Sequence, residues 1–339
     1  MGKFKEVLGV KKATLLLLGV LILATLVISA PVLHMYTALD VNEAKIYIEA
    51  FEKATGIKVD WVRMSSGEVL ARLEAERNNP RASIWFGGPA VDQIAAKNKG
   101  LLEPYKSPNA WSLDLAFKDY DGYWTGFYLG VIGFASNTKQ LEELGVEAPT
   151  SWQDLLKPEF KGRISVAYPY TSGTSYTILA GLIALMGEDE AFDYYKKLNK
   201  QIHHYNKSGS ACVTQVGLGE VTVGIAFAHD VIKKGVSKGY PVKLTVPEDG
   251  TSYEIGAMSV IKGGPEPELA HKFIDWMLTA EAQSLMKNWY RVPLNPDAEV
   301  VEGAVKITDV NVIPLDFVYF GQQKDRLIER WKTEIQYGD

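Results

Sequence analysis

The sequence of 339 residues contains a single cysteine, Cys212. One cysteine excludes an intrachain disulfide framework and a zinc site built on several cysteine ligands. The net charge of −5 argues against a general nucleic-acid-binding protein, which needs a basic face. Charges of both signs are interspersed, and there is no internal repeat or low-complexity tract. These absences favour a globular protein that does not bind nucleic acid.

The sequence also lacks the local motifs of common hydrolases. It contains no G-x-S-x-G elbow, no H-E-x-x-H motif and no dense cluster of aspartates and histidines. We therefore expect neither catalytic residues nor a cofactor.

Only one apolar run is long enough to enter a membrane. The basic segment 1–12 precedes 18 uncharged residues, 13–30, which is the pattern of an export signal. Pro31 would hinder cleavage after Ala30, so retention as an N-terminal membrane anchor is a second interpretation. No cysteine follows the run, which excludes a bacterial lipoprotein anchor. In either case we expect the folded part to work in the periplasm or at the cell surface.

The rest of the chain is long enough for two hydrophobic cores, because single cores stop growing near ~250–300 residues. Residues 32–88 alternate strand, helix, strand, helix and strand patterns, which predicts a largely parallel α/β lobe. A second set of strands and helices follows a long strand at 123–138. Two extended segments, near 123–136 and 250–262, join the lobes, and clefts between domains are preferred ligand sites. We assign residues 1–30 to the signal or anchor, 31–128 plus 257–290 to lobe 1, and 129–256 plus 291–339 to lobe 2.

The segment VTVGIAFAHD predicts a buried strand that ends on His229 and Asp230. Adjacent residues on a strand point to opposite faces, which makes this pair a poor catalytic dyad. Two further expectations concern local structure. The segment QIHHYNKSG is expected to form a polar turn, and PELAHKFIDWMLTAEAQSLMKN a run of helix.

Several motifs together resemble one protein family. YTALD with AFEKATGIKV is followed by EFKGRISVAYP, SGTSYT, LGEVTVGIAFAHD, SYEIGAMSVIKGG and PELAHKFIDWMLTAEAQ. In this order and spacing they resemble the extracellular solute-binding proteins of ABC importers, in the ferric-iron-binding-protein-like branch, over residues 32–336. The resemblance implies a type II periplasmic-binding-protein fold with two α/β lobes joined by a hinge around a ligand cleft. It also implies an ABC permease of the cytoplasmic membrane as partner, and we expect a monomer.

The ligand implied depends on the sub-branch. Iron binders of this family place two adjacent tyrosines where this sequence has Ala228, His229 and Asp230. The periplasmic hexose-phosphate-binding proteins are the better match, since they carry His-Asp at this point and a later glutamate, here Glu254. Carboxylates and an imidazole can form hydrogen bonds with sugar hydroxyls and so distinguish one sugar from another. His229, Asp230 and Glu254 are therefore the expected contacts for the polar end of the ligand.

The other end of the ligand is expected to be a phosphate. Strand ends followed by helix starts present unsatisfied N–H groups, which favour anions without any lysine. The segment TSGTSYT and the Ser65–Ser66 turn have this form, and their hydroxyls also suit ordinary helix capping. The expected phosphate contacts are Thr37, Ser65, Ser66, Gly88, Thr171, Ser172, Gly173, Thr174 and Ser175.

Three alternatives remain beside a receptor for a phosphorylated sugar or similar organophosphate. One is a carrier of ferric iron or another metal, with Asp230, Glu254 and His229 as ligands. A second is a receptor for a phosphonate such as 2-aminoethylphosphonate, whose amine a carboxylate could meet. The third is an extracellular phosphatase with His229 as acid or base. The absence of the hydrolase motifs named above argues against it.

Overall fold

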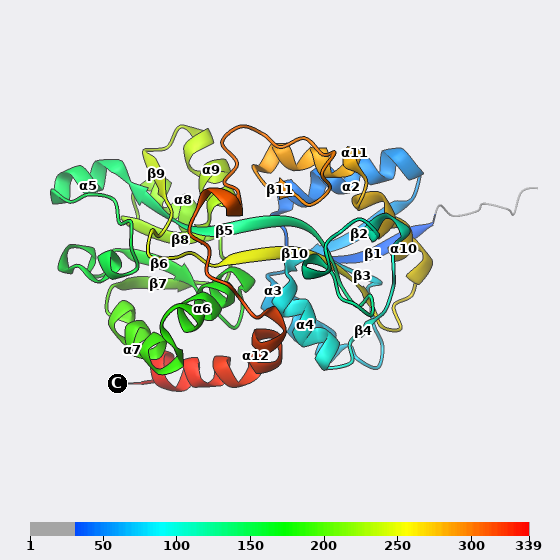
Figure 1. Ribbon diagram of the computed structural model, residues 1–339, viewed down its shortest axis with the longest axis horizontal. Helices are drawn as coiled ribbons and strands as arrows, with labels where there is room; N and C mark the ends of the chain where they lie inside the picture. The colour runs from blue at the N-terminus through cyan, green and yellow to red at the C-terminus, as the bar shows by residue number, and fades with distance from the viewer. Residues whose placement is uncertain (1–30, 339) are drawn as a thin grey trace, which may run out of the picture.

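The computed structural model describes residues 31–338 and shows a mixed α/β protein. Eight strands follow one another in the order β2-β1-β3-β10-β5-β8-β6-β7, with β4, β9 and β11 paired at its sides. Figure 1 shows helices gathered around the two ends of this sheet, while β5 and β10 run through the middle. The predicted export signal or anchor, residues 1–30, lies outside the described residues.

One end of the sheet, called half A here, carries the elements from β1 to β4 together with α10 and α11. Strands β1, β2 and β3 are parallel, and Met35 pairs with Ile84. Asp40 caps α2, which ends at Gly56 in the left-handed conformation that favours glycine. The elements are β1 (Val32–Thr37), α2 (Val41–Thr55), β2 (Lys58–Arg63), α3 (Ser66–Ala75), β3 (Ile84–Pro89), α4 (Ala90–Asn98), β4 (Leu102–Glu103), α10 (Pro267–Met277) and α11 (Ala280–Ser284).

The other end, called half B here, carries the elements from α5 to β9. Strands β6, β7 and β8 are parallel. The apolar helix α6 is buried along most of its length, as its continuous apolar sequence requires. The elements are α5 (Thr138–Leu144), β6 (Ile164–Ala167), α6 (Gly173–Met186), α7 (Glu188–Asn199), β7 (Ile202–Asn206), α8 (Ala211–Leu218), β8 (Val223–Phe227), α9 (Ala228–Lys234) and β9 (Val242–Thr245).

Two long strands lie where the halves meet, and β5 pairs with strands of both. Strand β5 (Thr125–Asn137) pairs antiparallel with β10 (Tyr253–Ile261) and β11 (Val292–Pro293) through residues 125–131. Its remaining residues pair with β8 and β9 of half B, where Ile132 lies opposite Phe227. These strands coincide with the two extended segments predicted to join the lobes. The lobe boundaries themselves stay a prediction.

The C-terminal helix α12 (Phe317–Trp331) packs on both halves. Phe320, Leu327 and Trp331 belong to the main core of half B. A buried ion pair joins Lys324 to Asp92 of α4 at 2.7 Å between Nζ and Oδ1. Figure 1 shows α12 along one side of the molecule, between α7 and α4. A second core fills half A between its sheet and α2 and α10.

The structure corrects three expectations about local structure. Strand β8 ends at Phe227, and His229 and Asp230 lie in the first turn of α9 rather than at a strand end. They do not point to opposite faces, since His229 Nε2 lies 3.6 Å from Asp230 Oδ2. The QIHHYN segment is strand β7, not a turn. The long helical run near the C-terminus is split at Thr279, which caps α11.

The core of half B generates a stability prediction. Trp331 is fully buried and packs edge-on against Tyr168 and Tyr205. Trp331→Ala should lower the free energy of unfolding by about 3–5 kcal/mol, because it leaves a large cavity. Urea unfolding followed by circular dichroism measures this. Trp111→Ala removes an indole that is 83% exposed and should change little, so equal losses in both variants would contradict the packing role.

Candidate ligand site between the two halves

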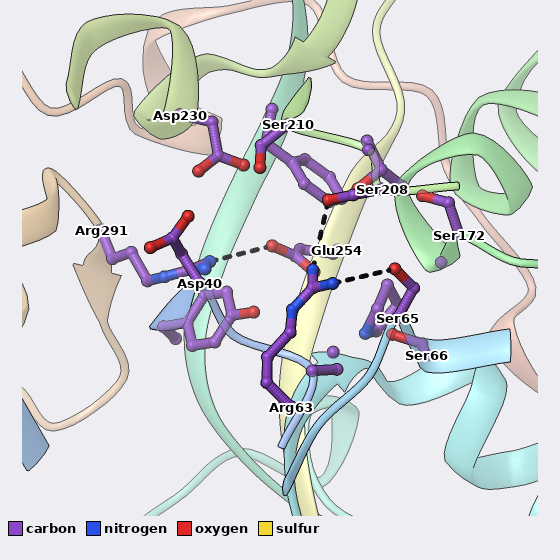
Figure 2. A pocket seen from close by; sticks show the side chains of 18 residues that line it. Asp40, Arg63, Ser65, Ser66, Ser172, Ser208, Ser210, Asp230, Glu254 and Arg291 are labelled. Atoms are coloured by element: carbon purple, nitrogen blue, oxygen red, sulfur yellow. Dashed lines mark hydrogen bonds and ion pairs between the residues drawn. The ribbon is translucent and has the colours of Figure 1, made fainter. Parts of the chain in front are cut away.

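A small cavity of about 40 Å³ lies where the two halves meet. Half A contributes the ends of β1, β2 and β3 with the helix starts that follow them. Half B contributes the start of α6, the turn before α8, and the junction of β8 with α9. Parallel strands bring their carboxyl ends to one edge, so segments far apart in the sequence converge here. Figure 2 shows side chains from both halves pointing toward one another across the space.

Three helix starts border the cavity. Ser65 and Ser66 begin α3, where Glu68 accepts a hydrogen bond from Ser65 N at 3.0 Å. Ser172 caps α6 by accepting from Ser175 N at 3.4 Å. The third helix, α4, begins directly after Gly88 and Pro89. The N–H groups of a first helical turn carry partial positive charge, so these three starts together favour an anion.

Arg63, the last residue of β2, brings a full positive charge to the same place. Its guanidinium donates to Leu39 O at 3.2 Å, to Ser65 Oγ at 3.3 Å and to Ser208 Oγ at 3.2 Å. All three acceptors are neutral, and within residues 31–338 no carboxylate lies within 4.0 Å of this guanidinium. Figure 2 shows the bonds to Ser65 and Ser208, which belong to opposite halves. Arg63 is thus a cation that faces the cavity without a counter-charge.

Arg291 lines the cavity in a different way, because carboxylates already neutralise it. It is 5% exposed, and its Nε and Nη2 donate to both carboxylate oxygens of Glu43. Its Nη1 donates to Glu254 Oε1 at 3.1 Å, and its guanidinium stacks 3.8 Å from the ring centre of Tyr128. Such a buried pair needs every partner in place, because an unpaired buried charge is costly. Arg291 therefore holds Glu254 in position.

Acidic groups gather beside Arg291. Asp230 is 7% exposed and accepts one hydrogen bond, from Trp289 Nε1 at 3.2 Å. His229 is also buried, and its Nε2 has no hydrogen-bond partner within the described part of the chain. That nitrogen lies 3.6 Å from Asp230 Oδ2 and 3.9 Å from Glu254 Oε1. Orphaned buried polar atoms of this kind are rare unless a ligand or water completes them.

One further ion pair crosses between the halves. Lys234 of α9 contacts Asp40, the N-cap of α2, at 3.1 Å, and it also donates to Ser210 Oγ at 3.0 Å. Together with the Arg63–Ser208 bond, this contact holds half B against half A at the mouth of the site.

The structure brings most of the predicted residues to this cavity. Ser65, Ser66, Gly88, Ser172, Gly173, Thr174, Asp230 and Glu254 line it. Four others do not line it, because their side chains make bonds elsewhere or stand behind the lining. Thr37 Oγ1 accepts from Leu39 N, Thr171 Oγ1 donates to Tyr168 O and Lys207 O, Ser175 Oγ donates to Ala167 O, and His229 lies behind Asp230 and Glu254. Whether any of these residues binds a ligand stays a prediction.

Sequence reasoning missed the two arginines and the acceptors around them. Arg63 stood at the end of a predicted strand, directly before the Ser65–Ser66 helix start, so its position was a usable signal. Arg291 follows Tyr290, whose φ of 56° is unusual for a residue other than glycine. Nothing near it in the sequence points to Glu43, its partner. The other missed lining residues are Ala38, Asp40, Pro89, Tyr128, Ser208, Gly209, Ser210 and Phe227.

Burial shifts the protonation of this cluster. It lowers the pKa of His229 well below the usual 6.5, with the Arg291 charge acting in the same direction, so the imidazole is neutral. Burial raises the pKa of Glu254 to about 8, although Arg291 opposes the rise. Burial also raises the pKa of Asp230, again against Arg291. The cluster can therefore both donate and accept hydrogen bonds near neutral pH.

Comparison with known proteins agrees with this arrangement. Residues 87–319 match the family model described as bacterial extracellular solute-binding protein. A protein of Haemophilus influenzae is 37% identical over 298 residues, which cover 85% of this chain and 86% of that one. A candidate 2-aminoethylphosphonate-binding periplasmic protein of Salmonella typhimurium is 28% identical over 247 residues, 71% of this chain and 70% of that one.

A solved structure is also similar to this chain. The periplasmic binding protein AfuA from Actinobacillus pleuropneumoniae, with exogenous fructose-6-phosphate bound, has a TM-score of 0.88 and 36% identity, covering 91% of this chain and 99% of that chain. These findings confirm the type II periplasmic-binding-protein fold that the motifs implied. Within residues 31–338, no group of three or more His, Cys, Asp or Glu is arranged to hold a metal ion, and no helix is long and apolar enough to cross a membrane.

The raised pKa of Glu254 generates a pH prediction. The folded protein holds a proton on Glu254 that the unfolded chain, with an ordinary pKa of 4.5, releases. Stability is therefore lost as pH rises from about 4.5 toward 8. Glu254→Gln keeps an acceptor for Arg291 but cannot ionise, so its free energy of unfolding should fall less than that of the wild type between about pH 6.5 and 8.

The range above pH 6.5 separates this effect from that of His229. Because the pKa of His229 is lowered in the folded protein, its contribution to stability is lost when the pH drops below the usual 6.5, the opposite of the pH dependence of Glu254. Urea titrations at several pH values provide the measurement, and Glu49→Gln on the exposed side of α2 is the control. Parallel pH profiles for wild type and Glu254→Gln would refute the assignment.

Proposed function

This chain belongs to the bacterial extracellular solute-binding proteins, and we propose that it captures a phosphorylated sugar or a similar organophosphate between its two halves. Its family implies export and delivery of a small molecule to an importer in the membrane. The proposed mechanism is binding without chemistry. A ligand that contacts both halves favours the closed form, which the permease then recognises.

The observation that carries this proposal is Arg63, a guanidinium without a carboxylate partner at the meeting point of three helix starts. A phosphate could replace the neutral Ser208 and Ser65 hydroxyls as its acceptor and gain charge-assisted bonds. Ser66, Ser172 and Thr174 would supply further donors. A dianion is the ligand that this combination of full and partial positive charges suits best.

The acidic cluster around Arg291 suits the other end of the ligand. The neutral imidazole of His229 lies 3.6 Å from the carboxyl group of Asp230 and 3.9 Å from that of Glu254. A sugar hydroxyl can donate to Asp230 and Glu254, which line the cavity, while His229 stands beside both carboxyl groups. The fructose-6-phosphate bound to AfuA, a structure 36% identical to this chain, supports a hexose phosphate as the first ligand to test.

A 2-aminoethylphosphonate-type ligand is the second candidate, and one observation favours it. Among the described residues, no Lys or Arg lies within 4.0 Å of the Asp230 carboxylate, and the nearby His229 is neutral. An ammonium group could pair with this buried carboxylate as well as a hydroxyl could. A thermal-shift comparison of fructose 6-phosphate with 2-aminoethylphosphonate separates the two, and a larger shift with the phosphonate would favour the second candidate. Ferric iron belongs in the same screen.

Replacing Arg63 tests the phosphate end. Arg63→Ala should weaken fructose 6-phosphate binding by roughly 10- to 100-fold, because a hydrogen bond to a charged group contributes about 1.5–3 kcal/mol. Inorganic phosphate should lose a similar factor. Isothermal titration calorimetry measures both affinities.

The matched control for Arg63 is Arg72→Ala. Arg72 lies on α3, is half exposed and pairs with Glu76, so it reproduces the change in net charge without touching the cavity. Its variant should bind within about threefold of the wild type. Wild-type affinity in Arg63→Ala would show that Arg63 does not hold the phosphate. A wild type that binds no organophosphate would refute the function itself.

Replacing Asp230 tests the polar end. Asp230→Asn should weaken fructose 6-phosphate binding by about 1–3 kcal/mol, since a buried hydrogen-bonding partner is lost. Inorganic phosphate should bind this variant as it binds the wild type, because it reaches only the Arg63 end. Asp60→Asn, on an exposed carboxylate of β2, is the control. Equal losses for phosphate and sugar phosphate would remove Asp230 from sugar recognition.

A further inference from the structure

Within residues 31–338, one backbone hydrogen bond joins half A to half B beside the cavity. Gly67, in the first turn of α3, donates its N–H to Thr171 O of half B at 3.0 Å. Two other polar contacts across the site, Arg63–Ser208 and Lys234–Asp40, use flexible side chains that can turn toward a ligand. The Gly67–Thr171 bond cannot adjust in this way, because main-chain atoms move only with their whole segments.

Gly67 leaves no room for a side chain in this arrangement. A Cβ atom placed on it would overlap the carbonyl oxygen of Tyr170 and lie 2.9 Å from the carbonyl carbon of Tyr170. Gly67 does not have a positive φ, so its backbone would accept alanine. Glycine costs about 1 kcal/mol relative to alanine inside a helix. A glycine at this position is therefore explained by the close approach of half B, which leaves no space for a Cβ atom.

The segment that Gly67 meets is firmly held. Ser172 N donates to Tyr168 O at 3.0 Å, and Thr171 Oγ1 donates to Lys207 O at 2.9 Å. The ring of Tyr170 stacks on that of Tyr168 at 5.0 Å between centroids. Because this turn cannot yield easily, a methyl group on residue 67 would have to move one whole half away from the other.

The small cavity gives this contact a consequence for ligand choice. With Gly67 against Thr171, the cavity, which is partly open to solvent, has a volume of about 40 Å³, room for a few water-sized groups between the halves. A small ligand leaves the backbone contact intact. A larger ligand can be bound only if the halves stop short of it. The contact thus limits closure, together with the close approach of Gly173 in α6 to Pro89 of half A.

We propose that Gly67 is a specificity-determining residue, whose backbone contact with Thr171 limits how far the halves close and so favours small ligands over large ones. This inference rests on the proposed phosphate-binding function for its ligands. Gly67 touches no ligand in this role; it acts through the distance between the two halves.

The test compares Gly67→Ala with the wild type by calorimetry, using inorganic phosphate and fructose 6-phosphate. Phosphate affinity should fall roughly three- to tenfold, the equivalent of one lost backbone hydrogen bond. Fructose 6-phosphate should lose less, because the halves close on this larger ligand to a point short of the Gly67–Thr171 contact, so the ratio of the two affinities changes. Small-angle X-ray scattering should show a larger radius of gyration for Gly67→Ala saturated with phosphate.

Controls separate closure from folding. Ala71→Gly, on the exposed face of the same helix, alters helix propensity by a similar amount and should leave the affinity ratio unchanged. Thermal unfolding of Gly67→Ala should show a cooperative transition like that of the wild type, which establishes that the variant is folded. Gly67→Ser, with a larger side chain, should shift the ratio further. An unchanged ratio and an unchanged radius in Gly67→Ala would overturn the inference.

Failure of the proposed function gives a different result. If the wild type binds neither phosphate nor fructose 6-phosphate, that function fails. Scattering of the ligand-free proteins then decides the role of Gly67 alone. A more open Gly67→Ala protein supports the closure limit, and identical scattering profiles of variant and wild type overturn it.

Discussion

The pairing of β5 with β10 is the constraint on which the rest of the structure depends. The two strands are antiparallel to each other, β10 pairs on its other edge with β3 of half A, and β5 changes partners from β10 to β8 of half B at about residue 132. The halves are therefore joined by continuous strands rather than by a loose linker. Any movement between them must be a bend or twist of these strands, which brings the same helix starts face to face each time.

Within this frame, the two arginines of the cavity have different roles. Arg291 is enclosed by Glu43, Glu254 and the Tyr128 ring. Its guanidinium is paired with the two glutamates and is not available to a ligand. Arg63 donates only to neutral oxygens and keeps its charge available. The site thus places a free positive charge at one end and oriented acceptors at the other, which gives a ligand a defined direction.

Much of the fold follows from local patterns in the sequence, since alternating strands and serine-capped helices were recognised from short segments. Residues 58–63 and the Ser65–Ser66 helix start are examples. The start of α9 was missed because Phe227, its N-cap, makes no side-chain capping bond. The apolar sequence of β8 therefore continues into Ala228 with no polar capping residue to mark the start of α9. Arg291 was missed for a different reason: its partner Glu43 lies 248 residues away, and no local pattern encodes a contact of that range.

Gly67 also bears on how such a receptor can diverge. Every glycine codon becomes an alanine codon by a change of its second base. On the role proposed for Gly67, one point mutation would therefore alter the preferred ligand size while all residues that face the ligand stay the same. Gene duplicates could separate their substrates by this route before any change in the recognition surface itself.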